Sequence, residues 1–162
     1  MYAEGTGRLL VKVASLWPVV DASGEQMDQA EMVRYLSEMI WFPAAFLAGN
    51  ISFEAVDDSS ARVTLTDHGR TVTATMFFDT QGRLTDFVAE RYRTPESSDP
   101  ETWSTPFTGY GEFEGLLLPA SGKVTWKLPD GDLEYLNVTL THLHYDTGAA
   151  DRTSAPPPEG SG

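Results

Sequence analysis

The sequence predicts an α+β protein in which a curved antiparallel β-sheet of about eight strands, a half-barrel or small barrel, wraps around one helix. Most of the chain alternates apolar and polar residues with a period of two, which is typical of antiparallel strands with one buried face. One segment instead has helical spacing. Short turn-forming tetrads separate the alternating segments at 67–70, 79–82 and 129–132.

The helix is expected over residues 28–47. Asp28 stands three residues before Glu31, a variant of the capping box that begins many helices. Pro43 should kink or end the helix. The apolar residues at helical spacing are Met32, Leu36, Met39 and Ile40.

The strands are expected to form hairpins along the chain. The linker 94–106 contains three prolines and should be an irregular excursion. Glycines at 109, 111 and 115 predict a bulge or strong curvature. The predicted strands span 8–17, 51–57, 61–67, 71–78, 84–93, 107–116, 123–128 and 133–145.

Composition excludes several classes of function. The chain carries 24 acidic and 11 basic residues, a formal charge of −13. Nucleic-acid binding and binding to anionic membrane surfaces both need a basic face, so neither is expected. No apolar run approaches the roughly 18 residues of a membrane helix, so we expect no membrane insertion. The chain contains no cysteine, which excludes disulfides and thiolate chemistry.

Residues 1–146 are expected to form a single domain, since 162 residues with 41% hydrophobic side chains can bury one core. Residues 147–162 lack any periodic apolar pattern and are expected to be a disordered tail. The first residues have no charged segment followed by an apolar one, as a secretory signal would. We therefore expect a cytoplasmic protein.

A first group of candidate site residues lies on the helix. Glu31, Arg34 and Glu38 fall within one narrow arc, because offsets of three and seven residues nearly superpose on a helix. Tyr35 and Trp41 lie beside this arc. The arc is either a solvated stripe of ion pairs or the wall of a cavity flanked by aromatic side chains.

Further candidates lie on the strands. Arg91 shares a face with apolar neighbours on the fifth predicted strand, so it should reach a barrel mouth or pair inside with a carboxylate such as Glu38. His142 and His144 should point the same way from the last strand. Such a pair can hold a metal only with a third ligand, and none has matching spacing. We expect no metal and no other cofactor, and a polar rim or satisfied histidines instead.

The sequence resembles a bacterial family of unknown function, of the DUF6544/DUF6920 type, over about residues 2–146. The matching residues are 31–43, Phe77-Phe78-Asp79 with Gly82, Arg91-Tyr92, Thr105-Pro106-Phe107 with Gly109, Gly115 with Pro119, Trp126 with Leu128 and Gly131, and Tyr135. The resemblance implies a curved sheet enclosing a helix, similar to lipoprotein carriers of the LolA type. By that analogy the concave side holds an apolar ligand.

The resemblance also implies that members are longer at the N-terminus, so we expect this chain to be a trimmed or compact relative with an open sheet edge that a homodimer could cover.

Two functions from different classes follow as expectations. The first is binding of a lipid-like or polyketide-like molecule in a cavity between helix and sheet. Its expected ligand-binding residues are Tyr35, Trp41, Phe78, Phe87, Trp126, His142 and His144. The second is a small barrel enzyme, an isomerase, cyclase or hydrolase, that uses Arg34, Glu38, Arg91 and Tyr110 for acid–base work. A third hypothesis is a protein that binds other proteins and has no small-molecule site.

Overall fold

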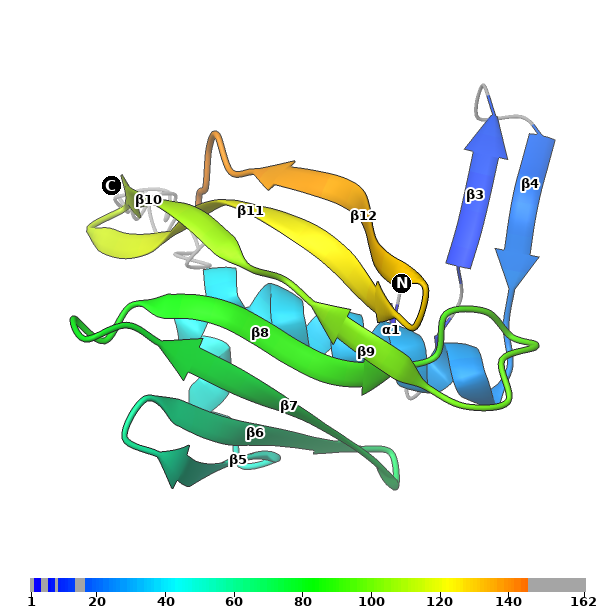
Figure 1. Cartoon of the computed structure of the whole chain (residues 1–162), viewed down its shortest axis with the longest axis horizontal. Coiled ribbons are helices and arrows are strands. Elements are labelled where there is room, and N and C mark those ends of the chain that lie inside the picture. The colour runs from blue at the N-terminus through cyan, green and yellow to red at the C-terminus, as the bar shows by residue number, and fades with distance from the viewer. Residues whose placement is uncertain (1, 4–5, 8, 14–16, 146–162) are drawn as a thin grey trace, which may run out of the picture.

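The computed structural model describes residues 2–3, 6–7, 9–13 and 17–145. Within these residues, an antiparallel sheet of eight strands curls around helix α1 (Glu25–Glu38) as a half-barrel (Figure 1). The predicted fold class is therefore confirmed. The tail predicted at 147–162 lies outside the described residues.

From β5 to β9 the strands of the sheet lie in chain order, and at the other end β11 lies between β9 and β10. Its order is β10–β11–β9–β8–β7–β6–β5, and β12 pairs with the other edge of β11. Its strands are β5 (Ile51–Asp57), β6 (Ser60–Asp67), β7 (Arg70–Phe78), β8 (Leu84–Arg91), β9 (Glu101–Ser104), β10 (Phe107–Phe113), β11 (Leu116–Leu128) and β12 (Gly131–Thr139). The long β11 pairs with β10 through its first half and with β9 through its second half.

The strand predicted at 8–17 is confirmed only in part, because a strand lies at Leu9–Val13 but does not join the main sheet. Strands β3 (Leu9–Val13) and β4 (Trp17–Ala22) form an antiparallel pair of their own, outside the main sheet. Strands β1 (Tyr2–Ala3) and β2 (Thr6–Gly7) form another. The main sheet takes its eighth strand from a segment predicted to be irregular.

That strand is β9, inside the predicted linker 94–106. Pro100 and Pro106 stand on either side of Glu101–Ser104 and not within it, so no proline removes a ladder hydrogen bond. Trp103 lies opposite Ala89 on β8 and Trp126 on β11. The four residues thus close the gap between the two halves of the sheet.

The boundaries around β10, β11 and β12 also differ from the prediction. The chain turns at Glu114 and Gly115, where φ is 48° and 82°, so β11 begins at Leu116 instead of 123. The predicted irregularity is confirmed by register shifts between Phe107 and Tyr110. Strand β12 ends at Thr139 and not at 145.

Helix α1 begins and ends earlier than predicted. Gly24 is the N-cap residue, and no side chain caps the helix. Asp28 lies within the first turns, where its Oδ2 is 2.6 Å from Arg70 Nη2. After Glu38 the chain tightens into two 3₁₀-helices, η1 (Met39–Trp41) and η2 (Pro43–Leu47). Pro43 stands at the start of η2, where its missing N–H costs no helical hydrogen bond.

The core lies between the apolar face of α1 and the concave face of the sheet. Met32 and Leu36 are fully buried, and Val63, Leu65 and Phe87 from the sheet are buried equally. The rest of the cluster is Val33, Met39, Ile40, Val72, Ala74, Met76, Leu84, Ala89, Trp103, Val124 and Trp126. None of the helices among the described residues is long and apolar enough to span a membrane.

Replacing Leu36 with alanine is expected to lower the free energy of unfolding by about 2–5 kcal/mol, because it removes a fully buried side chain and leaves a cavity. Leu47→Ala is the matched control: Leu47 is 88% exposed, so the change should stay within about 0.5 kcal/mol. Urea unfolding followed by circular dichroism measures both. Similar losses in the two variants would contradict the position assigned to the core.

Candidate functional site

A half-open cavity of about 460 Å³ lies between α1 and the part of the sheet formed by β9, β11 and β12. Its volume is within the range of small-molecule sites, roughly 300–1,000 Å³. The lining residues are Glu31, Arg34, Ser37, Glu38, Trp41, Arg91, Arg93, Trp103, Thr105, Val124, Trp126, Tyr135, Leu136 and Val138. One wall is apolar and aromatic, and the other carries charges.

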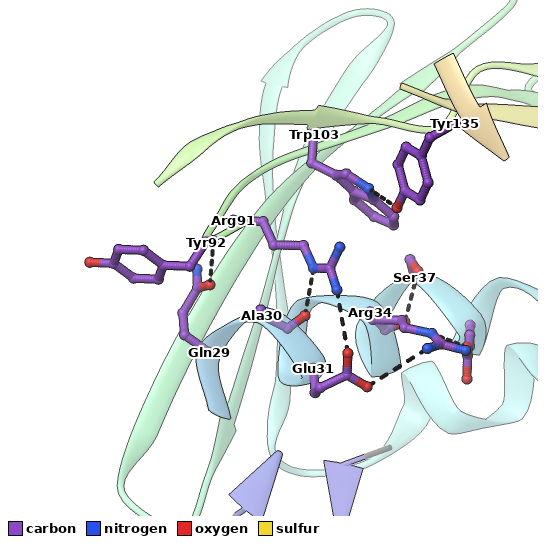
Figure 2. A network of polar contacts seen from close by, with 10 residues as sticks. Gln29, Ala30, Glu31, Arg34, Ser37, Arg91, Tyr92, Trp103 and Tyr135 are labelled. Atoms are coloured by element: carbon purple, nitrogen blue, oxygen red, sulfur yellow. Dashed lines mark hydrogen bonds and ion pairs between the residues drawn. The ribbon is translucent and has the colours of Figure 1, made fainter. Parts of the chain in front are cut away.

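The aromatic wall comes from three adjacent strands. Trp103 and Trp126 are opposite one another on β9 and β11, and both are buried. Tyr135 on β12 stacks on Trp126 with 6.2 Å between ring centroids and 22° between planes. Its hydroxyl accepts a hydrogen bond of 3.0 Å from Trp103 Nε1 (Figure 2). The three rings therefore form one continuous surface.

Arg91 joins the aromatic wall to the helix. From β8 it donates a hydrogen bond from Nε to the Ala30 carbonyl at 2.8 Å, and its Nη2 lies 3.4 Å from Glu31 Oε1 (Figure 2). Its guanidinium is 5.2 Å from the ring centroid of Trp103 and 5.5 Å from that of Trp126, within reach of cation–π attraction. Arg91 does lie inside, as its alternation on the strand suggests, but it contacts Glu31 and not Glu38.

Arg91 and Glu31 form a buried ion pair. Their side chains are 11% and 2% exposed. Burial lowers the pKa of Arg91, while Tyr135 and Glu31 raise it. Since an arginine starts from a pKa far above neutrality, the guanidinium stays charged. A buried pair of this kind is costly to break, because the charge that remains is still buried and has lost one of its partners.

Arg34 and Glu38 continue the charged wall toward solvent. Arg34 Nε donates a hydrogen bond to Glu38 Oε1 at 2.9 Å, and its Nη1 lies 3.8 Å from Glu31 Oε2. Both side chains are about half exposed. The predicted arc of Glu31, Arg34 and Glu38 thus reaches the cavity at its buried end and solvent at its outer end.

Two predicted aromatic residues, Trp41 and Trp126, line the cavity. Trp41 Nε1 donates a hydrogen bond to the Pro119 carbonyl at 2.8 Å, which fixes the ring. Phe87 lies away from it, because it is fully buried and meets Trp103 edge to face. Tyr35 is 44% exposed and does not line the cavity.

Phe78 and Tyr110 line a different hollow of about 340 Å³, near the turn between β7 and β8. Tyr110 donates a hydrogen bond to the Leu84 carbonyl, and Arg83 lies over its ring. Burial and the nearby Asp79 raise the pKa of the Tyr110 hydroxyl, while Arg83 lowers it. Tyr110 therefore does not join Arg34, Glu38 and Arg91 in one site.

The two histidines follow β12 and do not continue its face, because the strand ends at Thr139. Both are exposed; His144 is 83% exposed, and its Nδ1 lies 2.6 Å from Glu114 Oε1. Neither lines the cavity. The described residues contain no group of three or more His, Cys, Asp or Glu side chains placed to hold a metal ion.

Sequence reasoning missed Trp103, Thr105, Arg93 and Tyr135. The first three lie in or next to the segment predicted to be an irregular linker. Tyr135 is the extra residue at a register shift, because Leu136 pairs with Val124 while Glu134 pairs with Thr125. This bulge lets Tyr135 and Leu136 both line the cavity, which strict alternation forbids. No local pattern marks its position.

Replacing Arg91 with methionine is expected to lower the free energy of unfolding by about 3 kcal/mol, because it removes a buried ion pair and the hydrogen bond to the Ala30 carbonyl while Glu31 stays buried. Arg62→Met is the control, since Arg62 pairs with Glu54 on the surface and its loss should cost at most about 1 kcal/mol. The double change Glu31→Met with Arg91→Met should be less destabilising than Arg91→Met alone. Urea unfolding at neutral pH measures all three; equal losses for Arg91→Met and Arg62→Met would contradict the buried pair.

Comparison of the chain with known protein families agrees with the resemblance described from the sequence. Residues 1–138 match a family of unknown function, DUF6544. No curated protein and no solved structure matches the chain. Since the match spans most of the 162 residues, the chain belongs to the DUF6544 family of unknown function.

Proposed function

We propose that the protein binds a hydrophobic small molecule in the cavity between α1 and strands β9, β11 and β12. The observation that carries this proposal is the wall of Trp103, Trp126 and Tyr135 beside a half-open space of about 460 Å³. Small-molecule sites are typically concave and mostly apolar, with a few placed polar groups. This cavity has that composition.

Uncovered apolar side chains at the cavity support the proposal further. Tyr135 is 48% exposed and Leu136 is 49% exposed, although both face the cavity. Apolar surface that leaves water contributes roughly 25 cal/mol per Å². Binding of a ligand against β12 is therefore favoured, because it buries apolar surface that the folded protein leaves exposed to water.

The enzyme alternative, an isomerase, cyclase or hydrolase, would use the charged wall. Its acid–base candidates are engaged with one another: Glu38 accepts from Arg34, and Glu31 lies between Arg34 and Arg91. Each of these carboxylates already contacts an arginine, so neither is placed to exchange a proton with a substrate without first breaking an ion pair. We therefore favour binding over catalysis at this cavity.

Titration with the neutral fluorescent probe N-phenyl-naphthylamine tests the proposal. The wild-type protein should bind it, and Leu136→Asn should weaken binding by roughly tenfold because it removes apolar surface from the wall. Leu133→Asn is the matched control: Leu133 lies on the same strand and is 44% exposed, but does not line the cavity.

Absence of binding by the wild-type protein, or equal losses in the two variants, would contradict the proposal. Native mass spectrometry of freshly purified protein gives an independent reading, because a ligand carried through purification adds its own mass.

A further inference from the structure

Arginine side chains are concentrated at the cavity, in a chain where basic residues are scarce. The sequence has 11 basic residues against 24 acidic ones. Among the described residues, three arginines line this one cavity: Arg34, Arg91 and Arg93. Such a concentration is a property of the site and runs against the charge of the whole molecule.

The three arginines are not equivalent. Arg91 is used within the fold, because its Nε and Nη2 contact the helix and its guanidinium lies against two tryptophan rings. It is also only 11% exposed. Arg34 and Arg93 are 49% and 42% exposed and stand where the cavity meets solvent.

Arg34 and Arg93 keep hydrogen-bond donors for a ligand. Each is paired through Nε, Arg34 with Glu38 at 2.9 Å and Arg93 with Glu101 at 2.8 Å. A guanidinium has five N–H donors in a planar fork. Within the described part of the chain, the Nη groups of these two arginines donate no hydrogen bond; the nearest carboxylate contact is Arg34 Nη1 to Glu31 Oε2 at 3.8 Å. A carboxylate or phosphate matches such free forks.

We infer that the ligand is amphipathic, with an apolar body against Trp103, Trp126 and Tyr135 and an anionic head, a carboxylate or phosphate, held by Arg34 and Arg93. This inference rests on the proposed function, because it assigns a head group to the hydrophobic ligand of the same cavity. The acidic surface of the protein makes the local arginines, and not long-range attraction, the source of the preference for an anion.

Binding of three molecules that share one alkyl chain tests the head group: dodecanoate, dodecyl phosphate and the neutral dodecanol. Each is titrated at mildly alkaline pH by displacement of N-phenyl-naphthylamine. At least one of the two anions should bind about tenfold more tightly than dodecanol, and comparison of the two identifies the head group. The double variant Arg34→Gln with Arg93→Gln should abolish the preference while retaining dodecanol binding.

Two control variants separate the arginines from general charge. Arg62→Gln removes a surface arginine on β6, away from the cavity, and should leave the preference unchanged. Glu38→Gln should increase the preference, because it removes a competing carboxylate and releases Arg34 Nε. Circular dichroism of each variant confirms that it is folded.

The possible failures are distinguishable. If dodecanol and N-phenyl-naphthylamine bind but neither anion binds more tightly than dodecanol, the head-group inference is overturned and the proposed function stands. A preference that survives in the double variant also overturns it. If neither the probe nor any alkyl compound binds, the proposed function fails and the inference fails with it.

Discussion

The contact of Arg91 with α1 is the interaction on which the arrangement of this molecule depends. Arg91 reaches from the sheet to the Ala30 carbonyl and to Glu31, and it does so between two tryptophan rings. A buried charge must be compensated by partners in fixed places, so it tolerates little displacement of the helix relative to the sheet. The apolar core alone imposes no such exact position, because hydrophobic burial is non-directional.

That constraint divides the concave side of the sheet in two. On one side of Arg91, the apolar face of α1 packs against β6, β7 and β8 and forms the buried core. On the other side, β9, β11 and β12 continue the curve without an equally close helix face, and the cavity remains. Arg91 stands at the border, where its charge is matched by Glu31 and its planar face by the rings. A dense core and an open site thus share one sheet.

Patterns of hydrophobicity predicted the parts of the structure whose apolar residues recur with a regular period. The alternation of β6 and β7, the apolar stripe of α1 and the inward face of Arg91 are of this kind. Features that depend on distant partners were missed. Four residues between prolines form β9 only because β8 and β11 flank them, and the bulge at Tyr135 depends on its pairing with β11. The histidines were misplaced because alternation does not reveal where β12 ends. Trp103 and Tyr135 therefore lay beyond local patterns, while Trp126 and the charged residues on the helix were accessible to them.

The position of β12 has a consequence for the range of molecules that the cavity admits. Among the described residues this strand pairs only with β11, yet it supplies Tyr135, Leu136 and Val138 to the wall. Separating it from the sheet breaks one ladder of hydrogen bonds and the contacts of Tyr135 with Trp103 and Trp126, but leaves the other strands paired, so local opening there requires only a fraction of the free energy of global unfolding. The opposite wall is anchored by the buried pair. One side of the cavity is thus compliant and the other fixed, an asymmetry that suits ligands with a constant end and a variable length.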